Sequence, residues 1–100
     1  MLQPGLYRHR HEKEYVERSV HVGDILLRVR ETRTSFKLEL VENTVRYDAP
    51  QIDDLFRNAK QLTIRKNGSR HAMHIWSEHD FTLYPYRVGV PYWFQLDQSA

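Results

Sequence analysis

Cysteine is absent from this 100-residue sequence. Its absence excludes disulfide scaffolds, thiolate zinc sites and cysteine nucleophiles, and it agrees with a reducing compartment. Glycine and proline are scarce, with four of each, which argues against a low-complexity or linker-like chain. Apolar residues make up 40% and charged residues 28% of the sequence. These proportions are typical of a folded globular protein.

Long apolar segments are also missing. The longest aliphatic run is Ile25-Leu26-Leu27, far short of the roughly 20 residues that a membrane span needs. The first five residues, Met1 to Gly5, have no apolar stretch of signal-peptide length. We therefore expect a cytoplasmic protein that makes no contact with a membrane.

The chain has the length of one domain and shows no internal repeat or linker, which predicts a single domain over residues 1–100. Residues 1–11 show no clear period and are expected to be loose. Two alternating apolar runs flank Gly23-Asp24, a pattern typical of a β-hairpin with a type II′ turn. A further alternating run around Phe36 to Leu40 predicts the next strand, and Val45 and Tyr47 suggest a short fourth one.

One helix is predicted at about residues 49–60. Pro50 suits its first turn. The residues Ile52, Leu55, Phe56 and Ala59 form an apolar stripe at helical spacing. Because the helix is short, it needs to pack against strands to be stable.

Two hairpins are predicted after the helix. Asn67-Gly68 is the preferred dipeptide of a type I′ turn and predicts a hairpin over residues 61–77, which would place Arg65 opposite Arg70. A second hairpin is predicted over residues 81–96, at a sheet edge or with a bulge, because Pro85 and Pro91 cannot donate ladder hydrogen bonds. The expected fold is α+β: an antiparallel meander, the helix, and two hairpins in a curved or split sheet with the helix on one face.

A basic patch is the first candidate site. Residues 55–77 contain five cationic residues and no acid. Two like charges directly opposite on paired strands destabilise each other, and a bound anion would relieve the repulsion. Basic side chains beside aromatic ones can hold single-stranded nucleic acid. The predicted nucleic-acid or anion-binding residues are Arg65, Lys66, Arg70, His74 and Trp76, although these cations can equally be solvated or paired with glutamates.

The aromatic C-terminal third is the second candidate site. Alternation places Tyr84, Tyr86 and Trp93 on the face opposite to the one that fills the core. Tyrosine and tryptophan are enriched in protein interfaces because they combine a large apolar area with a polar group. These three residues are the predicted protein-interface residues, and a homodimer is one form that such an interface takes.

Catalytic and metal-binding motifs are lacking. The sequence has no glycine-rich phosphate loop and no Gly-x-Ser-x-Gly motif. No two histidines share a helix face at metal-ligand spacing, so no metal and no cofactor is predicted. The only conceivable chemistry is metal-independent RNA cleavage. It would draw on His74, Glu78, His79, Arg70 and Arg87.

The leading hypothesis is a small non-enzymatic binding module that acts through protein–protein contact or self-association. Its partner would be another protein or a second copy of the chain. The first alternative is a protein that binds single-stranded RNA or DNA through the basic patch at residues 57–70. The second alternative is a small ribonuclease.

Overall fold

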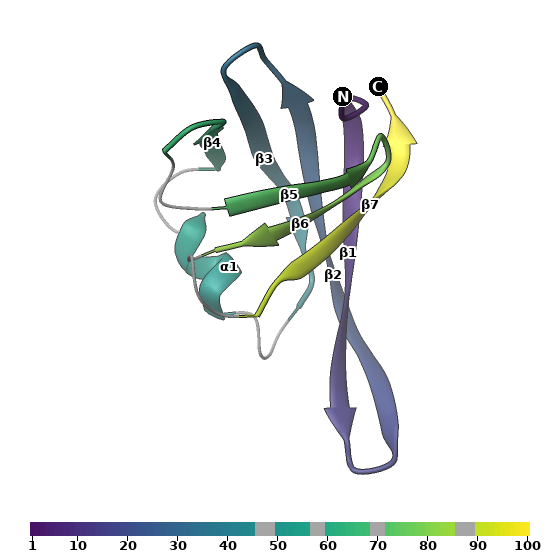
Figure 1. Ribbon diagram of the computed structural model, residues 1–100. Coiled ribbons are helices and arrows are strands. Elements are labelled where there is room, and N and C mark those ends of the chain that lie inside the picture. Colours follow the sequence, from purple (N-terminus) through teal and green to yellow (C-terminus); the bar gives the residue numbers. More distant parts are fainter. Residues whose placement is uncertain (46–49, 57–59, 69–71, 86–89) are drawn as a thin grey trace.

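The computed structural model describes residues 1–45, 50–56, 60–68, 72–85 and 90–100. It shows a nearly all-β protein in which one antiparallel sheet of seven strands curves into a nearly closed barrel (Figure 1). The elements are β1 (Gly5–Tyr15), β2 (Arg18–Glu31), β3 (Ser35–Asn43), α1 (Pro50–Leu55), β4 (Gln61–Arg65), β5 (Ala72–Ser77), β6 (Asp80–Tyr84) and β7 (Tyr92–Ser99).

The strand order is β4-β3-β2-β1-β7-β6-β5. It arises from two consecutive meanders, β1 to β4 and β5 to β7, which join where β7 pairs antiparallel with β1. The first and last strands of the chain therefore lie at the centre of the sheet, and both termini lie at the same end of the molecule (Figure 1). β4 and β5 form the two edges.

The core lies inside the curved sheet. Alternate side chains of the strands point inward, because successive residues of a strand face opposite sides. The buried core residues are Leu2, Tyr7, Ile25, Leu27, Val29, Leu38, Ile52, Phe56, Ile64, Phe81, Leu83, Tyr92 and Phe94. Phe81 stacks on Phe94 with ring centroids 5.2 Å apart, and Tyr7 packs on Phe81 at the same distance. The two meanders are thus held together by aromatic contacts as well as by the β1–β7 ladder.

The predicted hairpin at Gly23-Asp24 is wrong. β2 runs straight through these residues, and the turn lies at Val16-Glu17, where β1 and β2 meet as a long arm that extends beyond the barrel (Figure 1). The register of β2 shifts by one residue at Val22, so Gly23 lies at a β-bulge. A Cβ atom on Gly23 would lie 2.6 Å from the backbone of Val45. This glycine provides space for a neighbouring segment rather than a turn.

The expectation of a loose N-terminus over residues 1–11 is also wrong. From Gly5 onward the chain belongs to β1, which is paired with β2 on one side and with β7 on the other. The Tyr7 hydroxyl donates to the carbonyl of Gln3 at 2.5 Å, and burial raises the pKa of this phenol to about 12. The segment is ordered by its pairing with β2 and, at the far end of the chain, with β7, and neither pairing is indicated by a period within residues 1–11.

The helix is much shorter than predicted. It spans Pro50–Leu55, whereas the sequence suggested about residues 49–60. Its apolar stripe does face the core: Ile52 and the following Phe56 are buried, and Leu55 is half-buried. Ala59 and Tyr47 lie outside the described residues. With one short helix, the protein is nearly all-β rather than α+β.

The predicted hairpin over residues 61–77 does not form as a paired unit. β4 pairs with β3 and β5 pairs with β6, so the strands flanking Asn67-Gly68 lie at opposite edges of the sheet. The turn dipeptide connects the two edges of the nearly closed barrel instead. Arg70, and with it the expected Arg65–Arg70 pairing, lies outside the described residues.

The C-terminal pair of strands is confirmed. β6 and β7 pair antiparallel, with Phe81 opposite Phe94. The pair is not at an edge, because β7 continues the sheet to β1. Pro85 and Pro91 are tolerated since they lie directly outside the two strands, after Tyr84 and before Tyr92.

Candidate functional site

A cluster of aromatic side chains lies on the outer surface of β5, β6 and β7. His74 lies opposite Thr82, which lies opposite Trp93, so the three residues form a row across the strands. The indole ring of Trp76 stacks on that of Trp93, with centroids 6.3 Å apart and planes inclined by 24°. The His74 ring lies 4.1 Å from Trp76, whose Nε1 donates to Thr82 Oγ1 at 3.2 Å. Three strands thus position one cluster.

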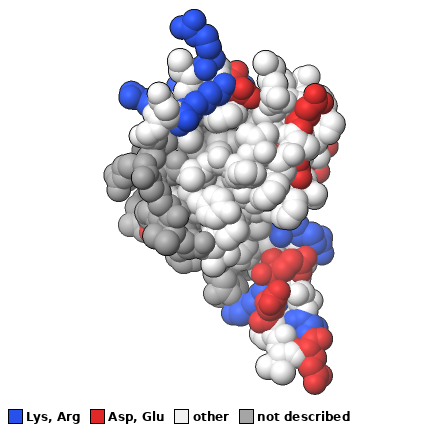
Figure 2. Space-filling model, viewed as in Figure 1, with Lys and Arg blue, Asp and Glu red and all other residues white. Residues whose placement is uncertain are grey.

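We call the outward residues His74, Trp76, Thr82, Tyr84 and Trp93 the aromatic face. None of these five residues carries a permanent charge. Figure 2 shows that the centre of this side of the molecule lacks Lys, Arg, Asp and Glu, which gather at its margins and on the arm. Trp76 is 56% exposed and Trp93 is 52% exposed. Two large indoles are therefore held in fixed positions and left open to solvent.

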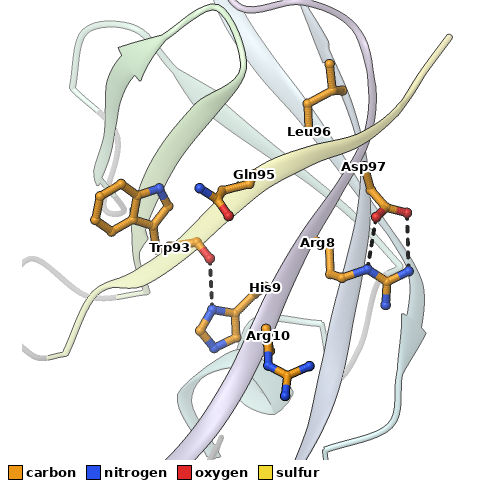
Figure 3. Close-up of a pocket in the computed structure, with 7 residues that line it drawn as sticks. All are labelled: Arg8, His9, Arg10, Trp93, Gln95, Leu96 and Asp97. Atoms are coloured by element: carbon orange, nitrogen blue, oxygen red, sulfur yellow. Dashed lines mark hydrogen bonds and ion pairs between the residues drawn. The ribbon is translucent and has the colours of Figure 1, made fainter. Parts of the chain in front are cut away.

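An open pocket of about 440 Å³ lies beside the aromatic face, where β1 and β7 separate (Figure 3). Its lining residues are Arg8, His9, Arg10, Trp93, Gln95, Leu96 and Asp97. Arg8 donates to both carboxylate oxygens of Asp97, at 3.1 and 3.2 Å, and this bond lowers the pKa of the carboxyl group. The charges of this pair are mutually satisfied. Trp93 therefore belongs both to the uncharged aromatic face and to the lining of this pocket, in which Arg8 and Asp97 neutralise each other.

His9 connects the arm to β7. Its Nδ1 lies 2.9 Å from the carbonyl of Trp93, and its Nε2 lies 2.9 Å from Nδ1 of His11 (Figure 3 shows the former). Because a carbonyl only accepts, His9 Nδ1 carries the hydrogen, and the neutral ring accepts from His11 at Nε2. Burial lowers the pKa of His9, and the neighbouring His11 adds to this effect, while the Trp93 carbonyl and Asp24 oppose it.

The lowered pKa of His9 makes stability depend on pH. In the unfolded chain His9 has its ordinary pKa of 6.5, whereas in the folded protein its pKa is lower, so the unfolded state binds the proton more tightly. We expect the free energy of unfolding to decrease as the pH falls through 6.5 toward the lowered pKa. In the His9→Gln variant this decrease should be smaller. Urea denaturation from neutral pH to about pH 5 measures the difference.

Replacement of the exposed His79 by glutamine is the matched control for this prediction. His79 interacts with Gln3 through its Nε2 at 3.0 Å, whereas the hydrogen-bond partners of the His9 ring are Trp93 and His11. An unchanged pH dependence in His9→Gln, with a reduced one in His79→Gln, would contradict the assignment of the effect to His9.

The described residues among those predicted to bind nucleic acid lie on or beside β4 and β5, which do not pair with each other. Arg65 ends β4 at one edge of the sheet, whereas His74 and Trp76 lie in β5 at the other edge. Lys66 Nζ donates to Glu31 Oε2 at 2.7 Å, and this bond lowers the pKa of Glu31. Arg70 lies outside the described residues. The cationic and aromatic residues of the predicted site therefore belong to two strands that share no ladder, and Lys66 is paired with a glutamate.

The residues predicted to form a protein interface are partly brought together. Trp93 is exposed on the aromatic face, and Tyr84 is half-buried on the same face at the end of β6. Tyr86 lies outside the described residues. The sequence analysis assigned Trp76 and Trp93 to different sites, but the structure stacks them. Only the order β7-β6-β5 makes them neighbours, and no local sequence signal reveals that order.

A catalytic arrangement is not assembled in the described part of the chain. His74 packs against Trp76 with the two ring planes inclined by 56°, and His79 is hydrogen-bonded to Gln3, so the two histidines have different partners. Arg70 and Arg87 lie outside the described residues. The described residues also contain no group of three or more His, Asp or Glu side chains placed to hold a metal ion.

Comparison with known proteins identifies no relative: no protein-family model matches the chain, no curated protein matches its sequence and no solved structure matches its fold. Within the described ranges, no helix has the length and apolar character to cross a membrane. The protein is thus a small, nearly closed antiparallel barrel with an exposed aromatic face.

Proposed function

We propose that the protein is a non-enzymatic binding module that associates with a second copy of itself through the aromatic face. The observation that carries this proposal is the stacked pair of Trp76 and Trp93, each about half-exposed on an uncharged surface. Aromatic residues are enriched and charged residues depleted at the centres of protein interfaces. Burying two indoles removes a large apolar area from water, which favours association.

The lack of charge on this face favours a protein over a nucleic acid. Nucleic-acid binding draws most of its affinity from cations that neutralise phosphates, and the five residues of the aromatic face supply none. An uncharged face also brings no like charges together when it meets a copy of itself. Most soluble oligomers are symmetric dimers formed by the same patch on both subunits, so self-association needs no other partner.

The neighbouring sheet edge supports contact with a second chain. β5 is an edge strand, and edge strands present unpaired backbone groups that a partner can approach. The register of β5 shifts between Ile75 and Ser77, which leaves Trp76 at a β-bulge. Bulges at edges limit unspecific strand pairing. Association therefore relies on the indole surface rather than on extension of the sheet.

Tryptophan fluorescence tests this proposal directly, because Trp76 and Trp93 are the only two tryptophans in the chain. We expect emission to shift to shorter wavelength, and quenching by acrylamide to decrease, as protein concentration rises from low to high micromolar. Sedimentation over the same range should show the mass rising from 12.1 kDa toward twice that value. Trp93→Ser should keep the protein at the monomer mass while the fold is retained.

Tyr15→Ser provides the matched control. Tyr15 is 50% exposed, close to the value of Trp93, but it lies at the end of β1 near the tip of the arm. This variant should associate as the unmodified protein does. A monomer mass at every concentration, or equal loss of association in both variants, would refute self-association through the aromatic face.

A further inference from the structure

The outer surface of β2, β3 and β4 carries a set of cations that we call the basic ladder: Arg28, Arg30, Lys37 and Arg65. Arg30 lies directly opposite Lys37 across β2 and β3, and Lys37 lies opposite Thr63 of β4. Arg65 follows two residues after Thr63 and so faces outward as well. Three adjacent strands thereby point four cations to one side of the molecule.

The basic ladder is only partly neutralised. Arg28 Nε lies 3.6 Å from Glu39 Oε1, and both side chains are more than half-exposed. Lys37 Nζ donates to the hydroxyl of Thr63 at 2.9 Å and forms no ion pair with a carboxylate of the described ranges. Arg30 and Arg65 form no ion pair with a carboxylate among the residues that the structure describes. The positive charge of this surface therefore exceeds its negative charge.

The Arg30–Lys37 pair is unfavourable in the free protein. Like charges directly opposite on antiparallel strands destabilise the pair, and Arg65 on the next strand adds a further positive charge. An anion placed over Lys37 would interact favourably with all of these groups. The sequence analysis sought such a like-charge pair at Arg65 and Arg70, whereas the sheet register places it at Arg30 and Lys37.

Two open pockets on this surface share Lys37. One has a volume of about 230 Å³ and is lined by Arg28, Arg30, Lys37, Glu39 and Gln61. The other has a volume of about 450 Å³ and is lined by Thr34, Ser35, Lys37, Thr63, Arg65 and Asn67. Hydroxyl and amide groups of Thr and Asn, together with Lys and Arg, are the usual donors to phosphate oxygens. Successive phosphates can thus be received on both sides of Lys37.

We propose that the basic ladder binds the phosphate backbone of double-stranded nucleic acid. Single-stranded nucleic acid is held by cations together with aromatic side chains on which the bases stack. None of the ladder residues or of the residues lining its two pockets is aromatic, and the exposed indoles lie on β5 and β7 instead. A surface of cations and hydroxyls without a stacking group matches paired strands, which present phosphates and keep their bases stacked.

The test is fluorescence anisotropy of a short labelled DNA duplex, titrated at several salt concentrations. With about four phosphates neutralised, the affinity should fall on the order of a hundredfold between 50 and 200 mM salt. The double variant R30Q/K37Q should bind more weakly, and its affinity should fall only about tenfold over the same range. Trp93→Ser should bind the duplex as the unmodified protein does, so the test is independent of self-association.

The double variant K13Q/R18Q is the matched control. It also removes one Lys and one Arg, but from the arm, where Lys13 Nζ and Arg18 Cζ each lie 5.8 Å from the Tyr15 ring centroid. Its salt dependence should equal that of the unmodified protein. The proposal is overturned by the absence of saturable duplex binding at low salt, by equal losses in the two double variants, or by tighter binding of the corresponding single strand.

Discussion

Replacement of Gly23 by alanine is expected to lower the free energy of unfolding by about 2–4 kcal/mol. Two costs combine. Gly23 has φ of +149°, a conformation that residues with a side chain rarely adopt, and its Cβ would lie 2.6 Å from the Cα and N atoms of Val45. Both clashing atoms belong to the backbone, so no side chain can rotate away.

The segment that a new Cβ would displace, Thr44-Val45, is hydrogen-bonded to Asp24, the residue that follows Gly23. Thr44 N–H donates to the carbonyl of Asp24 at 2.9 Å, and Asp24 N–H donates to Thr44 Oγ1 at 2.8 Å. Moving Val45 away from a new Cβ would stretch both bonds. The loss should therefore appear as a lower midpoint of urea denaturation with an unchanged slope, since the unfolded chain exposes the same surface.

Gly68→Ala separates the two costs. Gly68 also has a positive φ, of +89°, but a Cβ there would have no atom within 4 Å. This variant should lose only the cost of backbone strain, about 1 kcal/mol. If Gly23→Ala proved no more destabilising than Gly68→Ala, close packing of Val45 on Gly23 would not contribute to stability.

Replacement of Lys37 by glutamate is expected to change stability and binding in opposite directions. The repulsion from Arg30 directly opposite becomes an attraction, which should raise the free energy of unfolding by about 1 kcal/mol. The carboxylate can still accept from the Thr63 hydroxyl across β3 and β4. At the same time, a negative charge at the centre of the basic ladder should weaken duplex binding on the order of tenfold or more.

Urea denaturation and duplex anisotropy on the same preparation measure the two effects. Lys37→Gln is the intermediate case, because it removes the repulsion without creating an attraction, and it should give about half of the gain in stability. Raising the salt concentration should reduce the stability difference, since the pair is near the surface. If Lys37→Glu were instead less stable, the contribution of Lys37 to packing would outweigh its repulsion from Arg30, and the prediction would be wrong.

The strands that follow β2 show how much of the fold a local pattern can predict. Alternation identified the segments that became β3, β4, β5, β6 and β7, because a strand with one face in the core must alternate. The predicted strand pairing was wrong at two of the expected turns. Gly23-Asp24 and Asn67-Gly68 both have the composition of hairpin turns, yet one is a bulge and the other connects the two sheet edges.

The reason is that a glycine serves several purposes that look alike in sequence. At Gly23 it allows close approach of Val45, and that need depends on a residue 22 positions away. The turn that did form, Val16-Glu17, contains none of the favoured turn residues. Its position follows from the long pairing of β1 with β2, in which Tyr7 lies opposite Leu27 and Ile25 lies opposite His9.

The amino-acid pattern is sufficient to predict a small domain of antiparallel strands with an alternating core, an excess of C-terminal aromatic residues and no cysteine. Which of those residues become neighbours depends on how the strands pair in the folded protein. The pairing of β7 with β1 and the order β7-β6-β5 bring Trp76 to Trp93, and the register of β2 on β3 brings Arg30 to Lys37. Both surfaces depend on which strands pair and in which register, and these are properties of contacts distant along the chain that no local pattern specifies.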